Sequence, residues 1–156
     1  MKRREFLGTA TAVPALGWMC ASRVAAAPVH HFPRITFYGA AQQVSGSCHL
    51  LETSGGLYLV DCGLFVGDSA EDDQENREFP FDPKDVKAVL LTHAHADHQG
   101  RLPLLYKRGF RGKIYCTDAT RDLTTLSSQS GPSIDDEDNP LFDARDVEGV
   151  LKLLEA

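Results

Sequence analysis

Apolar and polar residues alternate in short runs over the first half of the chain, and this alternation predicts strands. The predicted strands are residues 34–38, 48–53 and 57–61. Between the last two lies Ser54-Gly55-Gly56, a composition typical of a tight hairpin turn. The ordered part of the chain is therefore expected to open as a β-meander.

The second half of the chain predicts a different order of elements. Residues 86–91 are apolar except for Lys87, which suggests a strand that is buried on both faces. A helix over 100–106 and a strand over 113–117 are expected to follow. Strands followed by a β-α-β-α order fit a mixed α/β layer architecture.

Two further helices are predicted near the end of the chain, each with an aspartate as its N-cap. Asp118 is expected to cap a helix that runs through Leu126, and Asp143 an amphipathic final helix. The polar segments 67–78 and 127–140 are interpreted as solvated loops. The apolar face of the final helix calls for a partner element, and none is predicted after it.

The first 27 residues have the layout of an export signal. Lys2, Arg3 and Arg4 precede a weakly apolar run, and small residues follow at 24–27. Arg3-Arg4 before Phe6-Leu7 resembles a twin-arginine signal. The apolar run is shorter than the ~20 residues that a membrane span needs. We therefore expect a signal at 1–27, a domain at 28–156, no transmembrane span, and an exported, periplasmic protein.

Charge and cysteine content narrow the classes of function. The chain has a net charge of −6, and residues 1–26 contribute four basic side chains and one acidic one, so the remainder carries −9. This acidity argues against a broad basic surface for nucleic acid, so such a substrate would be held by local groups, by metal or by other parts of a protein. Cys48, Cys62 and Cys116 show no metal-knuckle spacing and are expected to be buried free thiols.

The segment from Thr92 to His98 carries the candidate chemistry. His93, His95, Asp97 and His98 place three imidazoles and one carboxylate within six positions. In an extended segment, residues i and i+2 point to the same side about 6 to 7 Å apart, so His93 and His95 could share one ion. Nitrogen and oxygen ligands without thiolate suit zinc, with manganese or iron as alternatives. A surface histidine cluster or a structural site is disfavoured, because a buried strand leads into the segment.

These residues resemble a known family. His93-Ala94-His95-Ala96-Asp97-His98 matches the H-x-H-x-D-H signature of the metallo-β-lactamase superfamily, and Asp61 in Asp61-Cys62-Gly63 matches its earlier aspartate. The flanking stretches are similar to the β-CASP branch, nucleases related to RNA 3′-end-processing factors; they are residues 45–52, 79–81, 100–103 and 109–115. The resemblance implies a four-layer αββα fold of which this chain holds the N-terminal half of the sandwich.

The resemblance also implies a mechanism and roles for the site residues. The family's reaction is a two-zinc hydrolysis in which an activated water attacks a phosphodiester of RNA. His93 and His95 would hold one ion, and Asp97 and His98 the other. Asp97 would also orient the water, and Asp61 would support the ligands from behind.

The chain departs from the family pattern after the signature. Family members complete the site with further His and Asp ligands and an inserted domain, whereas no histidine follows His98. Asp118, Asp122 or Asp135 could substitute but are expected to be surface acids, and His30, His31 and His49 to be bystanders. A missing C-terminal half or a dimer partner is therefore expected to complete the site, with weak metal binding and little turnover by this chain alone. Two alternatives stay open: another hydrolase of this fold (thioesterase, lactonase or β-lactamase) and a non-catalytic remnant.

Overall fold

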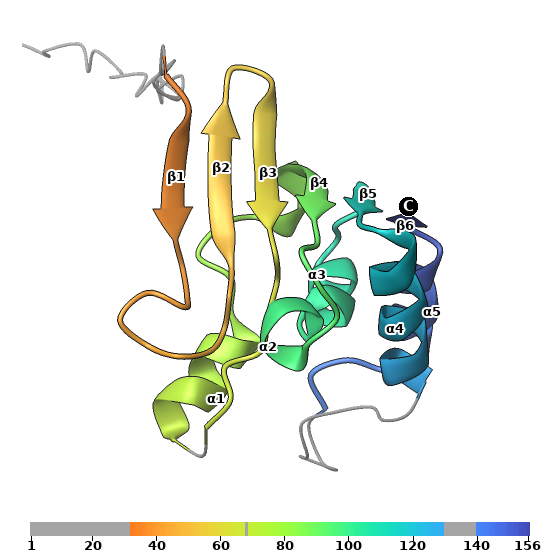
Figure 1. The fold of residues 1–156 in the computed structure, drawn as a ribbon. Helices are drawn as coiled ribbons and strands as arrows, with labels where there is room; N and C mark the ends of the chain where they lie inside the picture. The colour runs from red at the N-terminus through yellow and green to blue at the C-terminus, as the bar shows by residue number, and fades with distance from the viewer. Residues whose placement is uncertain (1–31, 68, 130–139) are drawn as a thin grey trace, which may run out of the picture.

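The computed structural model describes residues 32–67, 69–129 and 140–156, in which a six-stranded sheet is packed against helices (Figure 1). The strands lie side by side in their order along the chain. They are β1 (Arg34–Phe37), β2 (His49–Thr53), β3 (Gly56–Val60), β4 (Val86–Leu90), β5 (Lys113–Tyr115) and β6 (Leu154–Glu155). β1 to β3 are antiparallel, and β3 to β6 are parallel. The predicted mixed α/β fold is confirmed.

The hairpin between β2 and β3 forms at the predicted turn. Thr53 pairs with Gly56 across the turn, so Ser54 and Gly55 are its two loop residues. The Thr53 hydroxyl accepts a hydrogen bond from Gly55 N (3.0 Å) and donates one to Gly56 O (3.1 Å). These two bonds close the turn between β2 and β3.

Five helices and one 3-10 turn occur in the described residues. They are α1 (Ala70–Arg77), the turn Pro83–Asp85, α2 (Ala96–Gln99), α3 (Leu102–Lys107), α4 (Asp118–Gln129) and α5 (Ala144–Leu151). None of the helices in residues 32–67, 69–129 and 140–156 is long and apolar enough to cross a membrane.

The prediction of a loop over 67–78 is wrong, because α1 forms there. Ser69 and Asp72 make a capping box, and Arg77 pairs with Asp73 one turn away (2.9 Å). The helix is attached to the rest of the protein by a polar residue, Asn76. Its amide accepts from Phe65 N and donates to Phe65 O, both at 2.9 Å. α1 is thus held by a polar contact and has no apolar stripe, which is the pattern that normally identifies a helix in a sequence.

Asn76 gives a test of how α1 is held. Asn76→Ala is expected to lower the free energy of unfolding by about 2 kcal/mol, because two buried backbone groups of Phe65 lose their partners. Gln74→Ala, on the exposed side of the same helix, should change it by about 0.5 kcal/mol or less. Urea unfolding measures both, and equal effects would show that Asn76 does not anchor the helix.

The ends of α4 and α5 partly follow the prediction. Asp143 caps α5 with a full capping box, as expected. Asp118 does not cap α4, since it is already the first helical residue, and the Thr117 hydroxyl accepts from Thr120 N instead (3.2 Å). The expectation of an unpartnered final helix is wrong. α5 packs against α3, where Gly149 lies in close contact with the Tyr106 ring, and β6 follows it in the sheet.

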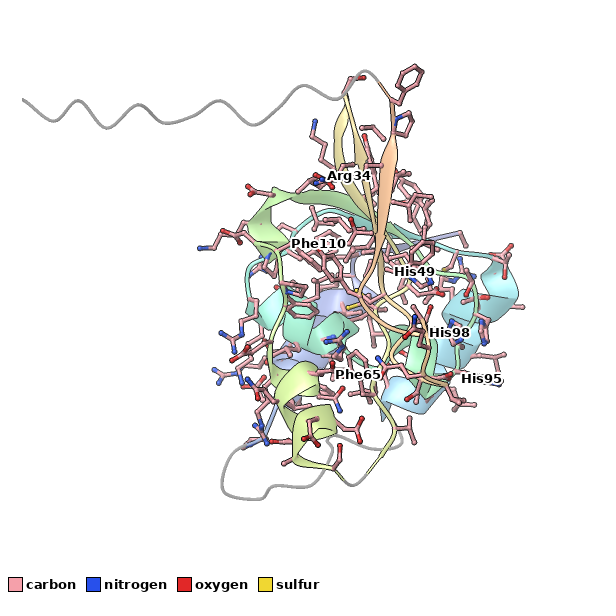
Figure 2. All side chains as sticks on the ribbon, turned by 90° about the vertical axis from the view of Figure 1, so that its left-hand side faces the viewer. Arg34, His49, Phe65, His95, His98 and Phe110 are labelled. Atoms are coloured by element: carbon pink, nitrogen blue, oxygen red, sulfur yellow. The ribbon has the colours of Figure 1, made fainter. Side chains whose placement is uncertain are left out.

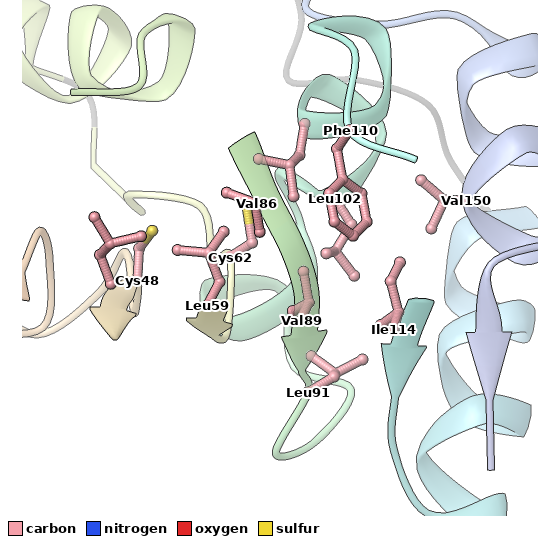
Figure 3. Close-up of a cluster of buried hydrophobic side chains, with 12 residues drawn as sticks. Cys48, Leu59, Cys62, Val86, Val89, Leu91, Leu102, Phe110, Ile114 and Val150 are labelled. Carbon is pink, nitrogen blue, oxygen red and sulfur yellow. The ribbon is translucent and has the colours of Figure 1, made fainter. Parts of the chain in front are cut away.

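The core lies between one face of the sheet and helices α3 and α5 (Figure 3). Leu59, Val89 and Ile114, adjacent in register on β3, β4 and β5, are fully buried against the helices. The opposite face is less covered: Leu90 and Tyr115, the next row of the sheet, are 45% and 47% exposed. The prediction that the 86–91 strand is buried on both faces is therefore wrong for the residues that the structure describes.

Candidate metal centre

The parallel pairing of β3 and β4 brings the candidate residues to one edge of the sheet. Val60 pairs with Leu90, so Asp61 and the segment starting at Thr92 leave the sheet side by side. Asp61 N donates to Leu90 O (3.0 Å), and Asp61 has a left-handed backbone with φ 62°. That conformation costs a residue other than glycine roughly 1 kcal/mol. The surrounding structure maintains it, which is typical of functional positions.

The Asp61 carboxylate lies buried beneath the histidine cluster, with its side chain 3% exposed. One oxygen accepts from Thr92 N and from the Thr92 hydroxyl, both at 2.9 Å. The other accepts from the Ser47 hydroxyl (3.1 Å) and is 2.7 Å from His98 Nδ1. A buried charge is tolerated when its lone pairs are satisfied in this way.

The three motif histidines lie against one another beside Asp97. The ring centroids of His93 and His98 are 4.0 Å apart, and those of His93 and His95 are 4.7 Å apart. His98 Nε2 is 3.6 Å from Asp97 Oδ2. Figure 2 shows His95 and His98 on one side of the molecule, away from Phe110 of the core. The structure thus brings together all four residues predicted as metal ligands.

The chemistry of these donors fits a divalent metal ion. Two ligands of a tetrahedral zinc ion, each about 2 Å from it, are separated by roughly 3.3 Å. The 3.6 Å between His98 Nε2 and Asp97 Oδ2 is close to that separation. Asp61 contacts the other nitrogen of His98, an arrangement that directs Nε2 to a metal. Among the described residues no group of three or more donors is placed to hold an ion, and the spacing of Asp97 and His98 is the geometric observation that favours one.

Backbone hydrogen bonds fix the path of the ligand segment. The carbonyls of Ala96, Asp97 and His98 accept from Leu64 N, Ser47 N and Cys62 N at 2.8 to 3.0 Å. Gly63 lies so close to this segment that a Cβ on it would overlap the Asp97 carbonyl. Only glycine allows this approach. The Asp61-Cys62-Gly63 stretch therefore positions the ligands through its backbone as well as through Asp61.

A hollow of about 470 Å³ opens beside His93 and His95, with one wall formed by α4. The wall carries Leu123 and Leu126, which are 57% and 62% exposed. α4 is joined to α2 by a hydrogen bond from Gln99 Nε2 to Ser127 Oγ (3.1 Å). The candidate ligands are therefore accessible to a substrate from this side.

The other polar residues considered from the sequence lie elsewhere. His49 is outside the ligand cluster, with its ring edge-on to Phe37 and its Nε2 3.4 Å from the Ser47 hydroxyl. Asp118 and Asp122 pair with Arg121 on the exposed side of α4. His30, His31 and Asp135 lie outside the described residues.

The three cysteines were predicted to be buried free thiols, and two of them are. Cys48 and Cys62 are buried and free, whereas Cys116 is free but only partly buried. Burial raises the pKa of the Cys62 thiol well above its ordinary value. Cys62 is therefore a neutral packing residue at neutral pH, although it lies next to Asp61.

Sequence reasoning missed three residues that support the site: Ser47, Thr92 and Arg101. Ser47, in the 45–52 stretch, and Thr92, next to the signature, bind Asp61, but no sequence pattern identifies either hydroxyl as a partner of that carboxylate. Arg101 is 2% exposed, and its Nε donates to Gly63 O (2.6 Å). Its guanidinium lies over two aromatic rings, with its central carbon 4.8 Å from the centroid of the Phe65 ring and 5.1 Å from that of the Phe79 ring. For Arg101, the only indication in the sequence was its position in the 100–103 stretch that resembles the β-CASP branch.

Comparison with known proteins identifies relatives of this domain. Residues 41–155 match the family described as the metallo-beta-lactamase superfamily. Ribonuclease TTHA0252 of Thermus thermophilus is 48% identical over 118 residues, which are 76% of this chain and 26% of that protein. Transcription termination factor FttA of Methanosarcina mazei is 42% identical over 98 residues, 60% of this chain and 15% of FttA. The chain thus spans about a quarter or less of the length of these relatives.

Solved structures of the same fold family are also similar. The short form of human tRNase Z matches with a TM-score of 0.43 and 21% identity, over 64% of this chain and 40% of that one. A B3 metallo-beta-lactamase with an active-site glutamic acid matches with a TM-score of 0.40 and 26% identity. The match covers 58% of this chain and 34% of that one.

The predicted periplasmic location is contradicted by the relatives. The similar proteins are a ribonuclease and transcription termination factors, whose names refer to RNA cleavage and to transcription and not to a periplasmic activity. The suggestion of export depended on residues 1–27, which lie outside the described residues, as does the predicted domain boundary at 28.

The signature at 93–98, the supporting Asp61 and the match over residues 41–155 agree with one another. The relatives with RNA-directed names agree with the RNA-processing branch expected from the flanking stretches. Proteins of this fold bind divalent metal, typically zinc. The chain belongs to the metallo-β-lactamase superfamily.

Proposed function

We propose that this domain provides the metal centre of a hydrolase that cleaves RNA. The observation that carries the proposal is the pair formed by Asp97 Oδ2 and His98 Nε2, 3.6 Å apart, with His98 oriented by the buried Asp61. The names of the relatives, a ribonuclease and transcription termination factors, support RNA as the substrate. These names do not support a thioester, a lactone or a β-lactam as the substrate.

Zinc is the metal that the donor set favours, because it consists of imidazoles and a carboxylate without thiolate. His93 and His95 would hold one ion, and Asp97 and His98 the other. When bound, zinc would supply Lewis-acid chemistry at the scissile phosphate and the attacking water.

The chain's own side chains have distinct tasks in this reaction. The Asp97 side chain is 32% exposed, so its carboxylate is accessible to a water and can accept its proton. Asp61 keeps His98 in position from behind. The hollow beside His93 and His95 admits the substrate. Because the chain is acidic, affinity for RNA phosphates would come from the metal, from local groups or from other parts of the protein.

A chimera tests this function. The matching 118 residues of the Thermus ribonuclease would be replaced by those of this chain, so that the rest of the relative completes the protein. We expect cleavage of a labelled single-stranded RNA that stops with a chelator and returns with zinc. Asp97→Asn in the chimera should abolish cleavage, whereas Asp122→Asn, an exposed acid of α4, should leave it intact.

The outcome that would overturn the proposal is equally specific. A folded, zinc-loaded chimera that hydrolyses a β-lactam, a thioester or a lactone and leaves RNA intact would exclude RNA cleavage as the function of this centre. Equilibrium dialysis of zinc against the unaltered 156-residue chain would separately test the prediction that this chain alone binds metal weakly.

A further inference from the structure

The Thr92 hydroxyl lies between the buried carboxylate and the first histidine of the signature. Thr92 Oγ1 is 2.9 Å from Asp61 Oδ1 and 3.0 Å from Asp61 Oδ2. On its other side it is 3.0 Å from His93 Nδ1. The Asp61 carboxylate therefore reaches two imidazoles: His98 directly and His93 through one hydroxyl.

The number of available protons determines the direction of these bonds. An ionised carboxylate only accepts hydrogen bonds, and a hydroxyl has one proton to donate. Thr92 must donate that proton to Asp61, since otherwise its oxygen would lie against both carboxylate oxygens without a hydrogen between them. The contact with His93 can then form only if His93 Nδ1 carries a proton and donates it to Thr92.

We infer that Thr92 is a positioning residue that holds His93 in the Nδ1–H tautomer and so presents His93 Nε2 to the metal. The inference rests on the proposed function insofar as it assigns His93 to a metal. Asp61 imposes the same tautomer on His98, whose Nδ1 lies 2.7 Å from the carboxylate. One buried carboxylate thereby orients two ligands, whose ring centroids lie 4.0 Å apart.

The inference is specific to Thr92 among the partners of Asp61. The Ser47 hydroxyl also donates to Asp61, but the ring it approaches is that of His49, which lies outside the ligand cluster. The Thr92 hydroxyl contacts both Asp61 and a predicted ligand. Loss of this group should therefore affect His93 more than His98.

Nitrogen NMR of the imidazoles in the zinc-free full chain tests the tautomer directly. We expect His93 with a protonated Nδ1 in the unaltered chain and in Thr92→Ser, and a mixture of tautomers in Thr92→Val. His98, which Asp61 contacts directly, should keep its tautomer in all three. An unaltered chain in which His93 is protonated at Nε2 would overturn the inference, whether or not any variant folds.

Zinc affinity of the full chain, measured by equilibrium dialysis over a range of zinc concentrations, gives the second readout. Thr92→Val should weaken zinc binding by about 10- to 100-fold, the usual effect of losing a group that orients a ligand. Thr92→Ser should restore the affinity. Thr53→Val, the same substitution at the remote hairpin, should leave it unchanged. Unaltered zinc affinity in a folded Thr92→Val would also overturn the inference. Because neither readout uses RNA, failure of the inference is distinguishable from failure of RNA cleavage.

Discussion

Asp61→Asn is expected to weaken zinc binding by about 10- to 100-fold and to lower the free energy of unfolding by about 3 to 5 kcal/mol. An amide has one accepting oxygen where the carboxylate has two. If that oxygen keeps the bonds from Thr92, the NH₂ group faces His98 Nδ1 and favours the other tautomer of that ring. His98 Nε2 then carries a proton and cannot bind metal. Urea unfolding in the presence of a chelator and a separate zinc titration measure the two effects.

Asparagine is the informative substitution at this position because it tolerates the left-handed backbone that Asp61 adopts. An effect on stability therefore reports hydrogen bonding rather than backbone strain. The matched control is Asp122→Asn, whose side chain is 72% exposed, and it should change stability by about 0.5 kcal/mol or less. Unchanged zinc affinity in a folded Asp61→Asn chain would show that the carboxylate does not orient the ligands.

Gly63→Ala is expected to destabilise the protein by at least about 3 kcal/mol and to abolish zinc binding. The added methyl group would overlap the backbone of Asp97, and backbone cannot move aside as a flexible side chain does. To make room, the ligand segment must give up its hydrogen bonds to Ser47, Cys62 and Leu64. Thermal unfolding and zinc titration check the two parts of this prediction.

Gly55→Ala provides the control for the glycine substitution. A Cβ at Gly55 would lie 3.4 Å from Thr53 Oγ1 and from the Tyr58 hydroxyl, an ordinary contact distance. Stability and zinc affinity should both stay close to those of the unaltered chain. Similar losses in the two alanine variants would indicate that the cost comes from glycine replacement in general and not from the contact with Asp97.

The sequence predicted the elements whose side chains alternate or repeat clearly. The hairpin at Ser54-Gly55 and the cap at Asp143 formed as expected. α1 was missed because it is held by Asn76 and not by an apolar stripe, and β6 because two residues carry no periodic signal. Thr117 caps α4 in place of the predicted Asp118. Both residues can act as an N-cap, and the sequence does not show at which of them the helical backbone begins.

The clustering of the four candidate ligands was predictable from the sequence, but, apart from Asp61, the residues that support them were not. The spacing of His93, His95, Asp97 and His98 suffices to suggest a shared ion, and the structure gathers their side chains. The link from Asp61 through Thr92 to His93 depends on two segments about 30 positions apart meeting at one sheet edge. No local pattern encodes that meeting, which follows from the parallel pairing of β3 with β4.

The ligand segment is attached to its neighbours through the carbonyls of Ala96, Asp97 and His98, that is, through atoms that every amino acid possesses. These backbone bonds do not depend on which side chains the segment carries. A protein engineer could exchange ligand types along this segment to change the preferred metal while the scaffold beneath stays the same. Gly63 would not tolerate such an exchange, because any Cβ there would overlap the Asp97 carbonyl.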